Sequence, residues 1–338
     1  MKPVLKNERG IALFLVLWVM ALLTVIAAEF CQSVGTEVDI VRNFKEETEA
    51  YYIASAGVSW IIGELVTNQY LSYPGNPGGD DDLPEAPRWR LSCEMPPIPF
   101  GKGMFKIKKE NESGKVNLNR ADRSLLKIML NGFEIEAADK DVIVDSIMDW
   151  RDENSLTRAN GAEDDYYQSL PEPYRCKNGD FTTIEELLLV KGVTPGIFYG
   201  GLKDMVSVYQ DENKPSTKGK RRKTETDFNK ININAAPAQM LRSLPGMTAE
   251  IAEEIMSYRV KKDFRSPSEL FDLVGSDVYR AIAPFTTLAP SSYFTIYSTG
   301  LLEGSRNRQG VRAVVKIDRR LGKGYEIIQW IDGLEYQS

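Results

Sequence analysis

Residues 11–28 read IALFLVLWVMALLTVIAA, a run of 18 residues in which Thr24 is the only polar one. At about 1.5 Å per residue, a helix of this length nearly spans the hydrocarbon core of a bilayer, which is roughly 30 Å thick. The leader before the run carries three basic residues, and Glu29 follows the run. Because basic flanks stay in the cytoplasm, the pattern predicts a cytoplasmic N-terminus and an exported chain after about residue 30.

The apolar run continues directly into a second helical stretch. Apolar residues keep helical spacing as far as Asn68, and no Pro or cluster of turn residues interrupts them. A cleaved secretory signal has a shorter apolar run, of roughly 7–15 residues. We therefore expect one long helix over residues 11–70, with residues 11–29 in the membrane. An ordinary single-pass anchor would show the same pattern.

The junction before the apolar run is more specific. Gly10 ends the charged leader MKPVLKNERG, residues 1–10, and Ile11 follows it directly. This junction resembles a type IV prepilin signal, which a peptidase cuts after the Gly before the new N-terminus is methylated. Most members of that family have Glu at the fifth mature position, where this chain has Leu15. The exception is the family of general secretion pathway protein K, the large minor pseudopilins of type II secretion systems. In a filament, that Glu neutralises the N-terminal amine of a neighbouring subunit. A subunit at the tip has no neighbour above it, so it needs no such carboxylate. The alternative is a chance Gly before an ordinary anchor.

Two later stretches repeat one pattern. KVNLNRADRSLLKIML begins the first copy, residues 115–210, and KININAAPAQMLRSLPG begins the second, residues 230–288. Both predict short capped helices and resemble helix-hairpin-helix modules, which bind phosphate through the N–H groups of a glycine-rich hairpin. The hairpins here, residues 131–134 and 245–248, lack the second Gly, and Glu134 stands where an anion would approach. These departures disfavour DNA binding, and our preferred interpretation expects no nucleic acid partner. A membrane-anchored DNA receptor is the alternative function.

The first copy contains an acidic insertion, DENSLTRANGAEDDYYQSLPEPYRCKNGD, that the second lacks. Carboxylates and amides at short spacing suit Ca²⁺, which takes six to eight oxygen ligands at roughly 2.3–2.6 Å. The spacing is not that of an EF-hand, and a solvated acidic loop explains it equally well. However, DWRDEN followed by GAEDDYY resembles the signature of the K pseudopilins. That resemblance implies a structural calcium ion with these candidate ligands: Asp149, Asp152, Asn154, Glu163, Asp164 and Asp165.

Alternating apolar and polar residues predict strands on both sides of this helical region. One strand falls within residues 71–114, which otherwise form a loop, and three fall within residues 289–338. The basic segment at residues 211–229 predicts a solvated linker, because no apolar or aromatic residue interleaves with the charges from residue 214 to residue 223. The alternative is a patch that binds nucleic acid or anionic lipid. We therefore expect an α+β fold in which a pilin-like long N-terminal helix packs on an antiparallel sheet. A large all-α domain of two helix-hairpin-helix (SAM-like) copies is inserted into it.

The composition excludes several kinds of site. The 338 residues include no His, so there is no Ser-His-Asp triad and no HExxH zinc site. Three Cys cannot form a four-Cys cage, and a net charge of −6 argues against a phosphate-binding surface. A disulfide between Cys93 and Cys176 fits an oxidising periplasm. Two separate thiols fit nearly as well.

These features together predict a non-enzymatic minor pseudopilin, anchored by one helix in the bacterial inner membrane with its C-terminal domain in the periplasm. The resemblance implies a position at the pseudopilus tip, where the protein assists assembly and the export of folded proteins across the outer membrane. The implied partners are the other minor pseudopilins of a tip complex, the prepilin peptidase and the inner-membrane assembly platform. A periplasmic hydrolase with a carboxylate pair is disfavoured, because the spacing reveals no acid/base partner.

Overall fold

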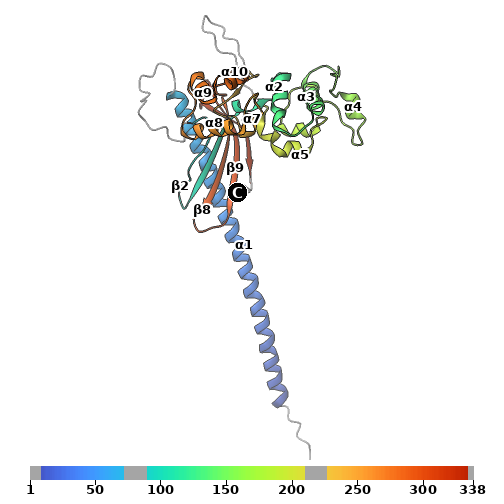
Figure 1. Cartoon of the computed structure of the whole chain (residues 1–338). Helices are drawn as coiled ribbons and strands as arrows, with labels where there is room; N and C mark the ends of the chain where they lie inside the picture. The colour runs from blue at the N-terminus through green and yellow to red at the C-terminus, as the bar shows by residue number, and fades with distance from the viewer. Residues whose placement is uncertain (1–8, 72–89, 210–226, 334–338) are drawn as a thin grey trace, which may run out of the picture.

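The computed structural model describes residues 9–71, 90–209 and 227–333, and its longest element is the helix α1 (Arg9–Leu71). In Figure 1, α1 leaves the body as a rod, and no other element lies beside its first half. Side chains are exposed from Ala12 to Lys45, whereas Ala50 begins a series of buried ones. Among the described residues, α1 alone is long and apolar enough to cross a bilayer, with a mean hydropathy of 2.4 over 18 residues. The prediction of one long helix is confirmed.

The sheet is antiparallel and has the order β1-β3-β8-β9-β10, with β2 also paired to β3. Its bounds are β1 (Cys93–Glu94), β2 (Ile98–Phe100), β3 (Gly103–Asn111), β8 (Tyr293–Leu302), β9 (Arg308–Ile317) and β10 (Tyr325–Asp332). The four predicted strands are β3, β8, β9 and β10. The pattern missed β1 and β2, because strands of two and three residues are too short to show alternation.

The second half of α1 packs on one face of this sheet. Its buried side chains, such as Val58 and Ile61, meet a layer that includes Ile107, Ile296 and Ala313. The helix and the sheet approach closely at Gly300, where a Cβ atom would lie 1.9 Å from the carbonyl oxygen of Ala50. A glycine is therefore required at this position, and the body is held rigidly against the helix that carries the apolar run.

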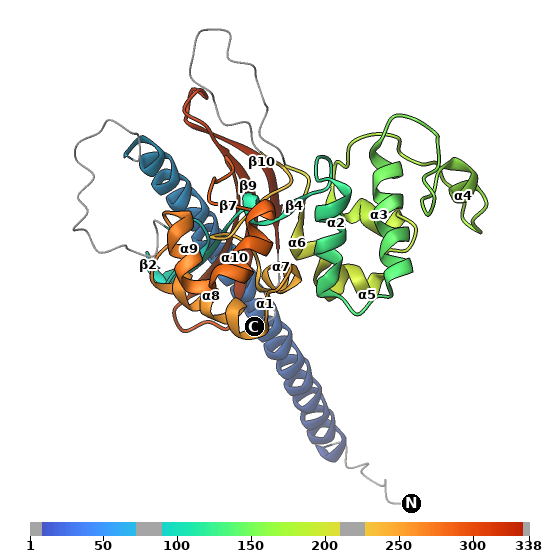
Figure 2. The ribbon, with the colours of Figure 1, turned by 45° about the horizontal axis from the view of Figure 1, so that its top comes forward.

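The helical region lies between β3 and β8 in the chain. Its first copy comprises η2 (Glu112–Gly114), β4 (Val116–Asn117), α2 (Arg123–Met129), η3 (Leu130–Gly132), α3 (Ala137–Arg151), α4 (Asp164–Gln168), η4 (Ile184–Leu189), α5 (Pro195–Ile197), the π turn η5 (Phe198–Leu202), α6 (Lys203–Met205) and β5 (Val206–Ser207). The second copy comprises β6 (Ile231–Asn232), α7 (Ala238–Ser243), α8 (Ala249–Lys261), α9 (Pro267–Val274), α10 (Ser276–Ile282), η6 (Ala283–Phe285) and β7 (Thr286–Thr287). Figure 2 shows the second copy beside the sheet and the first copy extending away from it.

The repeated asparagines make the same pair of hydrogen bonds to the backbone in both copies. Asn119 exchanges two hydrogen bonds with the backbone of Phe181, at 2.7 and 3.0 Å. Asn234 exchanges the equivalent two with Phe264, at 2.8 and 2.9 Å. Each side chain thereby fastens the start of its copy to the loop that follows the longest helix. The copies are two examples of one unit, as the sequence repeat predicted, and the α+β fold class is confirmed.

Candidate functional site

The acidic insertion follows α3, and the carboxylate of Asp149, near the end of that helix, is deeply buried. Asp149 is 0% exposed and accepts hydrogen bonds from the backbone N–H of Arg158, at 3.1 Å, and from its Nη1, at 2.5 Å. The same guanidinium bonds Asp152 at 2.5 Å. Gly161 closes over the pair, since a Cβ atom there would lie 1.9 Å from Asp149 Oδ2. Arg158 is therefore the cation that neutralises these two predicted ligands in this structure.

Glu163 has no such partner. It is 3% exposed, and neither of its carboxylate oxygens has a hydrogen-bond partner in the described part of the chain. Burial raises the pKa of Glu163, and nearby carboxylates, Asp149 first among them, raise it further, although the adjacent Cys176 acts in the opposite direction. A buried carboxylate without donors is costly, so its oxygens are open to a cation. Asp149, Asp152 and Glu163 thus supply oxygen donors of the kind that Ca²⁺ prefers, although the three do not converge on one point in the described chain.

The other three predicted ligands are placed less favourably. Asn154 folds back on Asp152, with Nδ2 donating to its Oδ1 at 2.7 Å. Asp164 accepts a hydrogen bond from the backbone N–H of Cys176 at 2.7 Å, and Asp165 is exposed. Within the described ranges, no three carboxylates or thiols already converge as a metal-binding group. The predicted ligands lie near the end of α3, in the loop that follows it and at the start of α4, and the structure does not assemble them into one site.

Three cations and one carboxylate that hold the insertion in place were missed from the sequence. Asp145 of α3 is buried, pairs with Arg123 at 2.9 Å and accepts from Asn160 Nδ2 at 3.0 Å. Lys191 donates to the carbonyl oxygen of Gly161 at 3.1 Å. Arg158 was the one detectable signal, because it lies within the insertion among the carboxylates that it neutralises.

The helix-hairpin-helix hairpins are not arranged to receive phosphate. At the N-terminus of α8, the carboxylate of Glu250 accepts hydrogen bonds from its own backbone N–H and from the Thr248 hydroxyl, which lower its pKa. The first hairpin is held against α7, where Gln239 donates to the carbonyl oxygen of Gly132 at 3.3 Å. A carboxylate therefore takes the place that an anion would need in the second copy. These contacts disfavour the DNA-receptor interpretation.

The two cysteines of the predicted disulfide lie in different cores, and no disulfide joins them. Cys93 is in β1, directly opposite Lys109 of β3 and beside the core under α1. Cys176 is buried in the core of the helical region, and burial raises the pKa of its thiol to about 12. The predicted Cys93–Cys176 disulfide is therefore wrong, because the cysteine-bearing segments belong to separate packing units.

The processing residues lie at the start of α1. Gly10 and Ile11 are helical, and the side chain of Leu15 is 54% exposed, with no other part of the described chain covering it. Residues 1–8 of the leader lie outside the described residues, and so do the basic residues from 214 to 223 of the linker. Cleavage after Gly10 thus stays a prediction.

The sequence of this chain is similar to those of known secretion proteins. Residues 107–211 match the family described as "Type II secretion system (T2SS), protein K", and residues 226–287 match "Helix-hairpin-helix motif". Type II secretion system protein K of Pectobacterium carotovorum subsp. carotovorum is 28% identical over 204 residues, covering 57% of this chain and 60% of that protein. The protein of the same name from Aeromonas hydrophila is 24% identical over 214 residues, covering 58% of this chain and 62% of that protein. The match thus spans about three fifths of each curated relative.

A solved structure shares the fold. The chain resembles one in the crystal structure of the GspK-GspI-GspJ complex from the type 2 secretion system of enterotoxigenic Escherichia coli, with a TM-score of 0.57 and 17% identity. The likeness covers 88% of this chain and 100% of that chain. It therefore extends beyond the helical region to most of the molecule.

Proposed function

We propose that this chain, which carries the protein K domain of type II secretion systems, works as a minor pseudopilin, a non-catalytic subunit of a short periplasmic filament. The observation that carries the proposal is the continuity of α1. Its exposed apolar half runs without a break into the half that packs on the sheet. A rigid helix of this kind anchors the body in the inner membrane and offers an apolar surface to neighbouring subunits.

The position at the filament tip is supported by two features. Leu15 supplies no carboxylate, so it cannot neutralise the N-terminal amine of a subunit above. The bulky helical region lies at the end of α1 far from the apolar run, where it would obstruct a further subunit (Figure 1). At the tip, the protein would begin assembly of the filament and assist the export of folded proteins across the outer membrane.

The proposed partners follow from the same role. One chain of the GspK-GspI-GspJ complex resembles this chain in fold, and GspI and GspJ are among the proteins of that complex. We therefore infer that two smaller minor pseudopilins bind this chain. The prepilin peptidase would cut between Gly10 and Ile11, and the assembly platform of the inner membrane would receive the mature helix. The N-terminus would face the cytoplasm and residues after α1 would lie in the periplasm.

A structural calcium ion is part of this proposal. Asp149, Asp152 and Glu163 would hold it, with Asn154, Asp164 and Asp165 available within the insertion. The support is the buried carboxylate of Glu163, whose oxygens lack partners in the described part of the chain. Bound calcium would neutralise a loop that otherwise depends on Arg158 and thereby rigidify the insertion.

The proposed function is tested by intact-mass and N-terminal analysis of the membrane-bound protein in cells that contain the secretion machinery. We expect a chain that begins at Ile11 with an N-methylated amine. The control is a Gly10→Val variant, which should keep the leader. A wild-type chain that begins at Met1 would refute the prepilin interpretation.

A further inference from the structure

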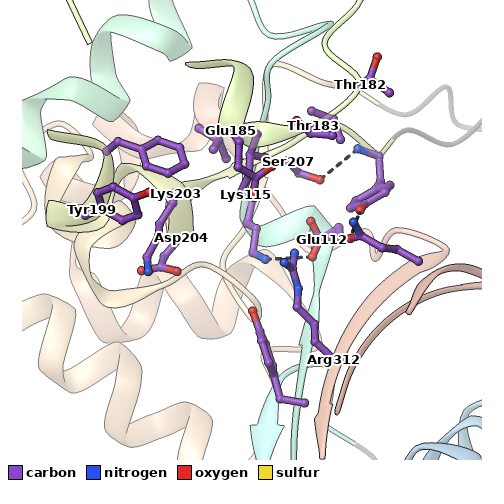
Figure 3. Close-up of a pocket in the computed structure, with 17 residues that line it drawn as sticks. Glu112, Lys115, Thr182, Thr183, Glu185, Tyr199, Lys203, Asp204, Ser207 and Arg312 are labelled. Atoms are coloured by element: carbon purple, nitrogen blue, oxygen red, sulfur yellow. Dashed lines mark hydrogen bonds and ion pairs between the residues drawn. The ribbon is translucent and has the colours of Figure 1, made fainter. Parts of the chain in front are cut away.

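A cavity of about 380 Å³ lies where the first helical copy meets the sheet. Its floor is the face of the sheet opposite α1, with Tyr297 and Arg312 among its residues, and Tyr199 and Lys203 come from the helical side (Figure 3). Tyr209 lines the wall and donates a hydrogen bond from its hydroxyl to Gln329 of β10 at 3.1 Å. The cavity therefore joins the helical region to the open side of the sheet.

In this cavity, Lys115 has ion-pair partners, whereas one buried N–H group of Arg312 has no hydrogen-bond partner in the described chain. Lys115 pairs with Glu112 at 2.9 Å and with Glu110 at 3.2 Å. Arg312 extends toward these groups in Figure 3, but its Nε is buried and has no hydrogen-bond partner within the described residues. A buried guanidinium N–H without an acceptor costs free energy, and a carboxylate is its best-matched partner.

Arg312 also belongs to a basic surface that leads out of the cavity. Strand register places Lys108, Tyr297 and Arg312 in one row across β3, β8 and β9, on the face that α1 does not cover. Lys106 and Arg308, which are exposed, lie on the same face in the next rows. The strands β8 and β9 contain no Asp or Glu, and the one acidic residue of β3, Glu110, is paired with Lys108 and Lys115.

The cavity itself has a balanced lining of three acidic residues (Glu112, Glu185 and Asp204) and three basic ones (Lys115, Lys203 and Arg312). The strand face beside it is basic although the whole chain has a net charge of −6, so the complement of that face is an acidic partner. A membrane surface is poorly placed to be that partner. Residues 29–45 of α1, between the apolar run and the body, add about 25 Å of helix at 1.5 Å per residue, whereas charge is screened within about 10 Å. The apolar side chains of Met104 and Leu301, next to these cations in the same rows, favour a polypeptide over a small anion.

We propose that this face, defined as Lys106, Lys108, Arg308, Arg312 and the adjoining cavity, docks an acidic segment of a neighbouring minor pseudopilin, with one carboxylate bound by Arg312. The inference rests on the proposed function for the existence of such a neighbour. It adds the place of contact and the charge of the segment that binds there.

The test uses the full-length chain, purified in detergent, and the two smaller minor pseudopilins of the same secretion system. Arg312→Gln should weaken their binding by about 30-fold, which is the lower end for one partner of a buried hydrogen-bonded charge pair. The double variant Lys106→Glu/Arg308→Glu should slow association and reduce its salt dependence, because both side chains are exposed. Arg280→Glu is the control for charge reversal away from this face, since it replaces one exposed cation by a carboxylate on α10, in the second helical copy.

The outcomes of these binding measurements separate the docking inference from the proposed function. If the wild-type chain binds the other pseudopilins, and the Arg312 and Lys106/Arg308 variants bind them with unchanged affinity and salt dependence, the docking inference is wrong while the proposed function stands. If Arg312→Gln abolishes binding to phosphatidylglycerol vesicles and leaves pseudopilin binding intact, the face recognises lipid and the inference is again wrong. A wild-type chain that binds none of the pseudopilins overturns the proposed function together with this inference.

Discussion

The contact between α1 and the sheet at Gly300 predicts that a single methyl group destabilises the body. In Gly300→Ala, the new Cβ would lie 1.9 Å from Ala50 O and 2.7 Å from Ala54 N, both of which are backbone atoms of α1. Normal contact needs more than 3 Å, so the helix and the sheet would have to separate by over an ångström. Overpacking in a core typically costs about 1–3 kcal/mol, and we expect the upper end because neither backbone is able to rotate away.

A loss of about 3 kcal/mol corresponds to a fall in Tm of roughly 6–12 °C for a domain of 150–250 residues. The assay is thermal unfolding in detergent, followed by tryptophan fluorescence; among the five Trp, Trp60 reports on this interface, because its ring lies 6.0 Å from that of Phe105. Gly63→Ala, also on α1, is the control, because a Cβ there meets nothing within 4 Å and helix propensity favours alanine. A Gly300→Ala protein with the same Tm as the wild type would refute the close packing of α1 on the sheet at this position.

Three further predictions test other parts of the molecule. Calcium should raise the Tm of the wild type, by an amount equivalent to about 2.7 kcal/mol at 100 times its Kd, and Glu163→Gln should abolish this gain while Glu172→Gln on the same insertion keeps it. Asn234→Ala leaves two buried backbone groups unbonded and should cost about 2–4 kcal/mol in urea unfolding; a loss below 1 kcal/mol would contradict the role given to the repeat. Hydrogen bonds from Arg320 lower the pKa of Asp318 to about 2, so its stabilising contribution is complete above the ordinary value near 4 and is lost as pH falls through 2. An NMR titration midpoint near 4 would contradict that pairing.

Local patterns predicted much of the architecture. The apolar run and the helical spacing after it depend only on neighbours three and four residues apart, and they predicted α1 almost to its end at Leu71. The asparagine repeat predicted two equivalent units, because each Asn bonds to a loop of its own copy. The resemblance to protein K, drawn from Gly10, Leu15 and the insertion, is confirmed by the family match and the curated relatives.

The candidate sites were predicted less completely, since they depend on contacts between distant segments. The acidic spacing predicted a cation site but not that Arg158 would bridge Asp149 and Asp152. The disulfide prediction paired the two cysteines of the exported part without knowledge that they lie in separate cores. The cavity at Arg312 has no sequence signature, because its floor and its helical wall come from distant parts of the chain, with Tyr297 lying 94 residues after Lys203 (297 − 203).

The sequence by itself determined the anchor, the order of helices and strands and the presence of a repeated helical unit. Each of these follows from periodicity and spacing along the chain. Only the tertiary structure decided which charges are neutralised, which thiols are buried apart and which face of the sheet is left open and basic. The physical reason is that burial and ion pairing depend on where the chain returns after a long excursion, and no local pattern records that return.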